Sequence, residues 1–162
     1  MTLFYLDTSA ILKMYKSENG SEFVEELIGQ RKSGETLVSS LITAVEVFSV
    51  ASRMTKGNIL SRKEYDSLTS RFLADFTSHF QVEAVDNPLI IASITITAIH
   101  GLRTADAIHL AAIQRAKSIV VEPEQFFAVT SDKEMIVACR TESIKVLNPE
   151  EVTSKNLLRS IR

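Results

Sequence analysis

The feature that most constrains the fold of this chain is a repeated passage from a short apolar run into a segment with helical spacing. Leu3–Leu6 is uninterrupted and apolar, stops at Asp7-Thr8-Ser9, and is followed by residues of helix-compatible composition. An apolar run of this length that ends in turn residues is typical of a strand buried on both faces. The start of the chain therefore predicts a strand, a turn and a helix.

The same passage recurs along the rest of the chain. Further strands are predicted at residues 36–39, 80–85, 125–130 and 144–147, and helices at residues 21–31, 41–54, 61–80, 89–100, 104–117 and 132–140. Strands that alternate with helices form a mainly parallel sheet that helices cover on both faces. The predicted fold class is therefore α/β.

Helix start signals support several of these assignments. Ser61 opens a Ser-Arg-Lys-Glu capping box, Asn87-Pro88 has the form of an N-cap followed by proline, and Thr104 is the predicted cap of the next helix. Residues 93–97 alternate with a period of two and are mostly β-branched, which suits a strand almost as well. The start signal and the length of the segment favour a helix there.

Length and composition indicate one folded domain. The chain has 162 residues, of which 45% are hydrophobic and 23% charged, unlike a disordered chain. Residues 1–150 are assigned to the domain and residues 151–162 to a short C-terminal tail. Eighteen Lys and Arg against 20 Asp and Glu give a net charge of −2. That balance argues against a basic protein that coats nucleic acid, but not against a nuclease with an acidic site and basic walls.

Cysteine content and leader sequences exclude other classes of protein. The single cysteine, Cys139, has no partner for an intrachain disulfide or a thiolate metal site. No positively charged leader precedes Leu3, and the longest stretch without Asp, Glu, Lys or Arg, Asn87–Leu102, is too short and too polar to span a bilayer. We therefore expect a cytoplasmic protein without a membrane partner.

Four carboxylates occupy positions that α/β sheets use for ligands. Asp7 follows the first predicted strand and Asp132 the fourth. Glu46 lies in the helix after the second strand, and Asp106 lies in the first turn of the helix that begins at Thr104. Open parallel sheets bind ligands at the carboxyl ends of their strands. If the four acids converge, their mutual repulsion favours hard cations that prefer oxygen ligands, which predicts a Mg²⁺ or Mn²⁺ site.

Each of these acids also has a purely structural explanation. Asp7 and Asp132 are suitable helix N-caps, and Asp106 complements the positive end of a helix dipole. Glu46 shares a helix face with Arg53 and fits a solvated ion pair. Spacing alone does not decide between the structural and the metal-binding interpretations.

Four segments that contain these acids form a recognisable set, namely Tyr5–Leu12, Thr43–Val47, Gly101–Ala111 and Val129–Met135. They resemble the PIN-domain family, and in particular its VapC-like toxin ribonucleases. They follow the order of the family's motifs and cover most of the chain from Leu3 to about Leu147. The third segment is the most specific, the first is moderately specific, and the second is weak alone. Residues 119–124 depart from the family, because this stretch is longer than the usual short turn.

The resemblance implies a PIN-like three-layer α/β/α sandwich and a divalent-metal-dependent endoribonuclease. Such an enzyme hydrolyses RNA with metal-activated water and leaves a 5′-phosphate and a 3′-hydroxyl. By motif position, the catalytic and metal-site residues are Asp7, Glu46, Asp106 and Asp132. Asp7 and Asp106 are the strongest metal-ligand assignments, while Glu46 and Asp132 either bind a second metal or orient water. Thr130 resembles the hydroxyl position beside the last acid.

The resemblance also implies partners. A VapC-like protein is the toxin of a toxin–antitoxin pair, so the implied partners are an RNA substrate, a cognate antitoxin protein and a second copy in a homodimer. The predicted helices 41–54 and 61–80 carry many apolar residues. Most are assigned to the core, and any surplus would serve the homodimer or a groove for an antitoxin segment.

Residues near the four acids are candidates for accessory roles. Arg103 either contacts a substrate phosphate or pairs with one of the acids. His109 is expected to be a packed or hydrogen-bonded histidine rather than a metal ligand. Other basic residues form walls for RNA or are ordinary solvated side chains; they are Lys13, Lys16, Arg53, Lys56 and Lys133. The basic tail from Ser154 to Arg162 reaches RNA or a partner, or is a frayed terminus.

Two other functions are consistent with parts of the pattern. One is a catalytically silent PIN-like module that binds RNA or a partner protein. The other is a phosphoacceptor signalling domain, suggested by Asp7, Asp86 and Lys133 near predicted strand ends. A phosphoacceptor domain needs several acids at its first strand, and only Asp7 is present there.

Overall fold

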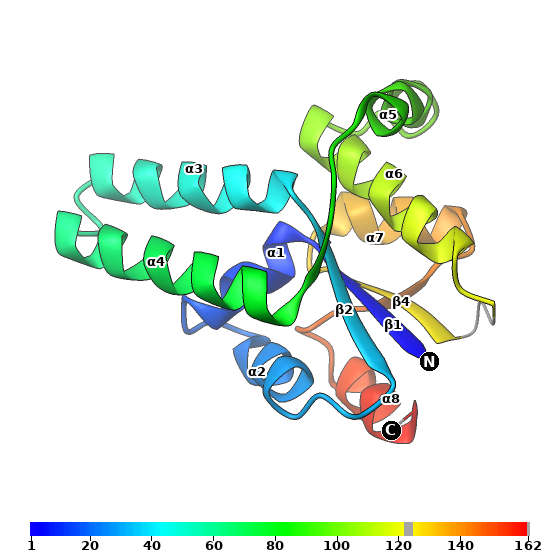
Figure 1. Ribbon diagram of the computed structural model, residues 1–162, viewed down its shortest axis with the longest axis horizontal. Helices are drawn as coiled ribbons and strands as arrows, with labels where there is room; N and C mark the ends of the chain where they lie inside the picture. Colours follow the sequence, from blue (N-terminus) through cyan, green and yellow to red (C-terminus); the bar gives the residue numbers. More distant parts are fainter. Residues whose placement is uncertain (122–124, 162) are drawn as a thin grey trace.

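A computed structural model describes residues 1–121 and 125–161 (Figure 1). Its centre is a five-stranded sheet in the order β3-β2-β1-β4-β5, in which every neighbouring pair is parallel. The strands are β1 (Thr2–Leu6), β2 (Glu35–Ser40), β3 (Gln81–Glu83), β4 (Phe126–Val129) and β5 (Lys145–Leu147). The predicted α/β class with a parallel sheet is confirmed. Within the stretch that departs from the family pattern, residues 122–124 lie outside the described residues.

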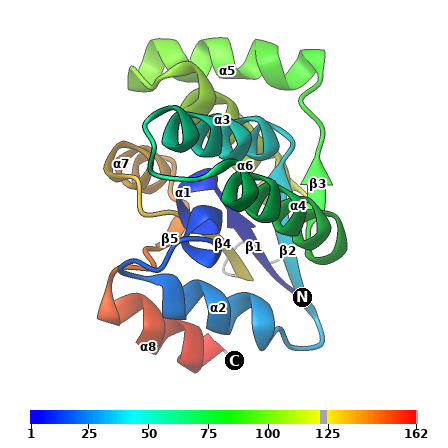
Figure 2. The same ribbon diagram turned by 90° about the vertical axis from the view of Figure 1, so that its left-hand side faces the viewer.

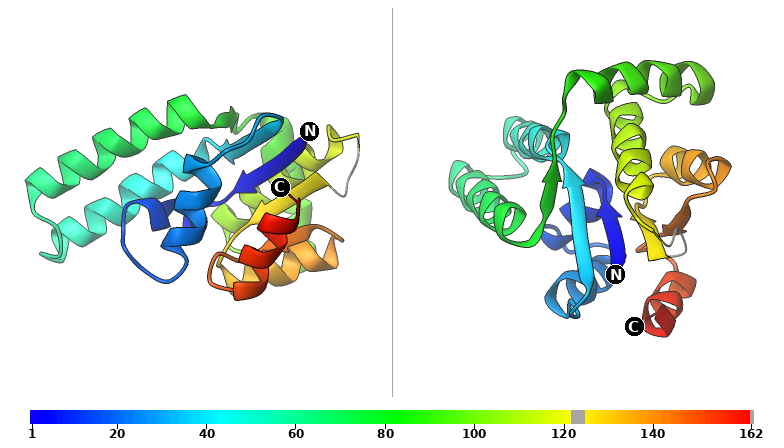
Figure 3. Two further views of the ribbon diagram at one scale, coloured as in Figure 1. Left: turned by 90° about the horizontal axis from the view of Figure 1, so that it is seen from below. Right: turned by 45° about the vertical axis from the view of Figure 1, so that its right-hand side comes forward.

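Helices connect the strands and cover the sheet. They are α1 (Thr8–Ile11), the short 3-10 helix η1 (Leu12–Met14), α2 (Ser21–Gly29), α3 (Ile42–Lys56), α4 (Arg62–His79), α5 (Asn87–His100), α6 (Thr104–Ser118), α7 (Lys133–Thr141) and α8 (Val152–Ile161). Helices α5, α6 and α7 lie on one side of the sheet and α2 and α8 on the other, while α3 and α4 form a hairpin that projects beyond the sheet (Figures 1 and 3).

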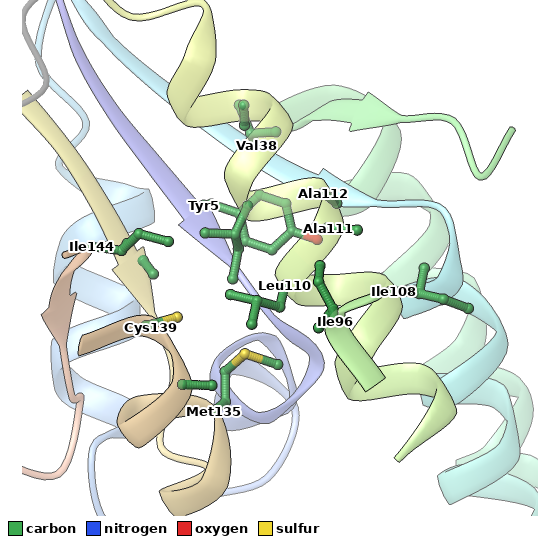
Figure 4. Close-up of a cluster of buried hydrophobic side chains, with 14 of the residues drawn as sticks. Tyr5, Val38, Ile96, Ile108, Leu110, Ala111, Ala112, Met135, Cys139 and Ile144 are labelled. Atoms are coloured by element: carbon green, nitrogen blue, oxygen red, sulfur yellow. The ribbon is translucent and has the colours of Figure 1, made fainter. Parts of the chain in front are cut away.

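Strand residues alternate between two hydrophobic cores, one on each face of the sheet. In β1, Leu3 and Tyr5 belong to the core under α5, α6 and α7, where the Tyr5 ring lies against α6 (Figure 4). Phe4 and Leu6 belong to the core under α1, α2, α4 and α8. Successive side chains of a strand point to opposite faces, so an entirely apolar run requires cover on both faces. The predicted three-layer sandwich is confirmed.

The strand order creates a switch point between β1 and β4. The chain adds β2 and β3 on one side of β1, and then crosses to place β4 and β5 on the other side. Leu6 pairs with Val129, so Asp7 and Thr130 follow at adjacent strand ends. Ligands of open α/β sheets bind at such points. The order also differs from the 2-1-3-4-5 order of phosphoacceptor domains, which argues against that alternative.

Two helix starts differ from the prediction. Helix α5 is capped by Asp86 rather than Asn87, because the Asp86 carboxylate accepts the Leu89 N–H at 3.0 Å and is itself held by Arg115 at 2.9 Å. Helix α6 begins at Thr104 itself and has Arg103 at the N-cap position, without a side-chain cap. The capping box that begins at Ser61 is present as predicted.

The C-terminal residues that were assigned to a tail are helical rather than frayed. Helix α8 lies beside α2 (Figure 2) and buries Ser154 and Leu158, the latter within the second core. Lys155 Nζ lies 2.9 Å from a carboxylate oxygen of Glu22 on α2. Apolar burial and this ion pair hold the segment in place; Arg162 lies outside the described residues.

Helix α5 is apolar in sequence yet largely exposed. Only one side of the helix packs inward, whereas Ile91, Ile94 and Ile99 are each at least 65% exposed. In the described part of the chain, no single helix is long and apolar enough to cross a membrane. Among the described helices, only α5 and α6 taken together reach that length and composition, and the chain bends by 112° between them.

Candidate active site

Asp7 ends β1 and caps helix α1. Its Oδ1 accepts hydrogen bonds from the Ala10 N–H at 2.9 Å and the Ser9 hydroxyl at 2.8 Å, and its Oδ2 accepts one from the Thr130 hydroxyl at 2.6 Å. Burial raises the pKa of Asp7, while His109 and these hydrogen bonds oppose the rise. The capping role is therefore real. It is compatible with metal binding, because Oδ2 accepts only one of these hydrogen bonds and has a second lone pair.

A hydroxyl network joins the end of β1 to the end of β4. The fully buried Thr130 hydroxyl donates to Asp7 and accepts the Asp132 N–H at 3.0 Å. Ser9 Oγ accepts the Ser131 N–H at 3.0 Å. Asp132 also caps α7 through its Oδ1. These bonds fix the backbone that carries Asp7 relative to the backbone that carries Asp132.

Glu46 reaches from α3 to α1 and α6. Its Oε2 accepts hydrogen bonds from the Thr8 hydroxyl and from His109 Nε2, the latter at 2.9 Å. Burial alone would raise the pKa of Glu46. The hydrogen bonds from His109 and Thr8 outweigh this effect, and the net result is a pKa below the ordinary value. Arg53 instead donates to Ser49 at 2.6 Å. Within the described residues Arg53 forms no ion pair with Glu46, although its charge contributes to the lowered pKa of Glu46.

His109 joins Glu46 to the core of the protein. The side chain is only 2% exposed, and its Nδ1 lies 2.9 Å from the Tyr5 hydroxyl. His109 Nε2 also lies 3.2 Å from Thr8 Oγ1. The expectation of a hydrogen-bonded, packed histidine is confirmed.

Asp106 lies in the first turn of α6 and faces the same region. It shares a cavity of about 320 Å³ with Asp132; the other lining residues are Arg103, Ser131, Lys133 and Glu134. Burial raises the pKa of Asp106, and the negative charges of Asp132, Glu46 and Asp7 raise it further, while His109 opposes the rise. The structure therefore brings the four predicted acids close enough for the charges of the other three to act on Asp106. Arg103 lines the cavity but, within the described residues, forms no ion pair with any of the four acids.

The donor set fits a hard divalent cation. It consists of carboxylates, which Mg²⁺ and Mn²⁺ prefer, and contains no thiolate. As the side chains stand, no three His, Cys, Asp or Glu residues in the described ranges are arranged to hold a metal ion. A cation shared by these acids therefore requires side-chain movement, and the partly exposed Asp106 and Asp132 have the room to move.

An apolar groove lies beside Ser9 and Ser131. It has a volume of about 400 Å³ and reaches Ser9 and Ser131 at the acidic site. Its apolar lining comes from η1, α3, α4 and the loop before α4, and includes Leu12, Val47, Val50, Ala51, Met54, Leu60 and Leu68. Lys13, Lys16, Glu18 and Glu150 add charged groups to the lining.

Sequence comparison decides the family. The PIN domain pattern matches residues 4–140. The chain belongs to the PIN domain family. PIN domains are typically nucleases. No curated protein shows significant sequence similarity to the chain.

Solved structures share the fold of this PIN domain at low sequence identity. FitAcB from Neisseria gonorrhoeae is 19% identical with a TM-score of 0.61, covering 92% of this chain and 99% of that one. A toxin–antitoxin complex from Klebsiella pneumoniae contains a chain that is 18% identical with a TM-score of 0.58, covering 94% and 100%. VapC20 of Mycobacterium tuberculosis, described as a Sarcin-Ricin loop cleaving toxin, is 14% identical with a TM-score of 0.61, covering 83% and 94%.

Sequence reasoning missed two polar side chains at the acidic site of this PIN domain. Thr8 and Tyr5 both contact His109. Thr8 directly follows the first acid, which was a usable signal. Tyr5 occupies an apolar run and looks like an ordinary core residue, so nothing in the sequence marked its hydroxyl.

Proposed function

We propose that this PIN domain is a divalent-metal-dependent endoribonuclease that hydrolyses RNA phosphodiester bonds with Mg²⁺ or Mn²⁺. The observation that supports the proposal is the placement of Asp7, Glu46, Asp106 and Asp132 around the switch point of the sheet. Asp106 and Asp132 line one cavity there, and burial together with the charges of the other three acids raises the pKa of Asp106. Carboxylates that repel one another are stabilised by a hard cation. A catalytically silent module gives no reason to retain that repulsion.

The roles of the residues follow from their surroundings. When bound, the metal neutralises phosphate oxygens and lowers the pKa of the attacking water. Asp7 and Asp106 are proposed as the principal ligands, and Glu46 and Asp132 bind a second metal or orient water. Thr130 holds Asp7 in place through its 2.6 Å hydrogen bond.

Substrate binding is assigned to the cationic residues beside the acids. Arg103 and Lys133 are exposed and line the same cavity as Asp106 and Asp132. A guanidinium and an ammonium in the same cavity as the acids are suited to bind the phosphates that flank the scissile bond. They compensate locally for the net negative charge of the chain.

We further propose that the protein is a VapC-like toxin with an antitoxin partner. The similarity to FitAcB and to the Klebsiella toxin–antitoxin complex supports this assignment. The apolar groove is suited to an amphipathic segment of such a partner. Because the groove reaches Ser9 and Ser131, a segment bound there would lie beside Asp7 and restrict access to the acids.

A homodimer through α5 completes the proposal. The exposed Ile91, Ile94 and Ile99 form an apolar surface of the kind that proteins cover by association. A second copy can bury the same helix through a two-fold axis, because such an interface is self-complementary.

The central test is metal-dependent cleavage of a defined RNA. We expect cleavage with Mn²⁺ or Mg²⁺, loss of cleavage with a chelator, and a fall of at least about 100-fold in Asp7→Asn and Asp106→Asn, the scale at which removing one electrostatic group lowers kcat. Asp66→Asn is the matched control, because Asp66 is exposed on α4 and pairs with Arg62. Undiminished cleavage by the Asp7 and Asp106 variants would contradict the assigned site. RNA binding without turnover would support the silent module instead.

A further inference from the structure

The hydrogen bonds around Glu46 form a chain that continues into the core. Tyr5 Oη lies 2.9 Å from His109 Nδ1, and His109 Nε2 lies 2.9 Å from Glu46 Oε2, which the Thr8 hydroxyl also contacts. These four residues come from β1, α6, α3 and α1. The chain therefore links one of the four acids to three other elements of the fold.

The chemistry of Glu46 fixes the direction of its hydrogen bond with His109. A carboxylate only accepts hydrogen bonds, so His109 Nε2 carries the proton that is donated to Glu46. On the other side of the ring, Nδ1 is paired with the Tyr5 hydroxyl, which holds the ring in its orientation. Tyr5 is 0% exposed and His109 is 2% exposed, so bulk water does not compete for either bond. Both ring nitrogens are thereby engaged, which leaves His109 no lone pair for a metal.

We propose that His109, oriented by Tyr5, is a positioning residue that holds Glu46 by one oxygen and leaves the other for the metal ion. Both hydrogen bonds to Glu46 end on Oε2, and Oε1 is the oxygen assigned to the metal. A glutamate on a helix otherwise loses rotamer freedom when it binds a cation. Fixing the carboxylate beforehand lowers that entropic cost, as partners of metal ligands do in other sites. This inference rests on the proposed metal-dependent function.

The test is the affinity for Mn²⁺ alone, measured by calorimetry without RNA. We expect His109→Leu to weaken Mn²⁺ binding at least about tenfold, the scale reported for loss of such partners. His109→Gln keeps an N–H that can reach Glu46 and should retain most of the affinity. In the Glu46→Gln background, His109→Leu should have no further effect, because the interaction on which it acts is gone.

Controls separate positioning from general loss of structure. Ser39→Ala removes two other buried hydrogen bonds, to the Leu6 carbonyl at 2.8 Å and with the Thr43 hydroxyl at 2.9 Å. It should leave Mn²⁺ affinity unchanged at a similar loss of melting temperature. If His109→Leu does not fold, Tyr5→Phe is the variant to test instead. It removes the hydroxyl that contacts His109 but keeps the ring, and it should also weaken Mn²⁺ binding.

The outcomes distinguish this inference from the proposed function. Equal Mn²⁺ affinity of wild type and His109→Leu, or of wild type and Tyr5→Phe where that variant replaces it, overturns the inference and leaves the proposed function standing. An equal loss in the Glu46→Gln background also overturns it, because His109 then acts elsewhere. If the wild type itself binds no Mn²⁺, the metal-dependent function fails and the inference fails with it.

Discussion

Thr130 donates a 2.6 Å hydrogen bond to Asp7 across two adjacent parallel strands, from a position 123 residues later in the chain. The same hydroxyl accepts the backbone N–H of Asp132. One buried hydroxyl thus fixes two of the four acids relative to each other, which explains why a threonine rather than an apolar residue directly follows β4.

Replacing that hydroxyl should cost both stability and activity. We expect Thr130→Val to lower the free energy of unfolding by about 1–3 kcal/mol, because it leaves the buried Asp7 carboxylate short of a donor at nearly constant side-chain volume. Urea unfolding measures this loss, and RNA cleavage should fall in parallel. Thr130→Ser keeps the hydroxyl and should retain most of both. A Thr130→Val variant as stable as wild type would show that the bond has no net value.

The ionised Asp106 carboxylate should lower the stability of the metal-free protein. Burial and the neighbouring acids raise its pKa in the folded protein above the ordinary value of the unfolded chain. The folded state then binds protons more tightly, so the ionised group destabilises the protein at neutral pH and this penalty disappears as the pH falls below its unfolded pKa. Asp106→Asn should therefore raise the free energy of unfolding of the metal-free protein at pH 7, by less than about 1 kcal/mol because the site is partly solvated.

The pH dependence provides the check on Asp106. The stability difference between Asp106→Asn and wild type, from urea unfolding without divalent metal, should shrink as the pH is lowered toward the ordinary aspartate pKa of about 3.9, because the folded wild-type carboxyl gains its proton before that pH is reached. A destabilised Asp106→Asn at pH 7 would contradict the repulsion on which the site assignment depends.

Divalent metal should stabilise the folded protein. A ligand that binds only the folded state adds about 2.7 kcal/mol at 100 times its dissociation constant. We expect Mn²⁺ to raise the melting temperature of the wild type and to have little effect on Asp106→Asn, measured by calorimetry at fixed ionic strength. An equal rise in the Asp106→Asn and Asp66→Asn variants would place the metal elsewhere.

The exposed face of α5 should determine the oligomeric state. We expect wild type to be dimeric in light scattering and the double variant Ile91→Lys, Ile94→Lys to be monomeric, because each side chain is 65% exposed in the single chain and lysine is costly only if that surface is covered. Val137→Lys on α7 has the same exposure and is the control. A dimeric double variant would exclude α5 as the interface.

Local pattern predicted most of the fold because strand and helix signals need only neighbouring residues. The strand at Leu3–Leu6, the capping box at Ser61 and the parallel sheet all emerged as predicted. The errors lie where a distant residue decides. Asp86 caps α5 and is held by Arg115, 29 residues away. Residues 152–161 are helical because Leu158 packs into the hydrophobic core.

The candidate site divides in the same way. The sequence by itself determined which acids follow strand ends, and hence that Asp7 and Asp132 are suitable helix N-caps at the carboxyl edge of the sheet. Only the tertiary structure decided that Glu46 is hydrogen-bonded to His109, 63 residues away. It also decided that the hydroxyl of Tyr5, in an otherwise apolar strand, is hydrogen-bonded to the same histidine. Side-chain periodicity is a property of the local backbone, whereas the partner of a buried polar group depends on which elements pack together.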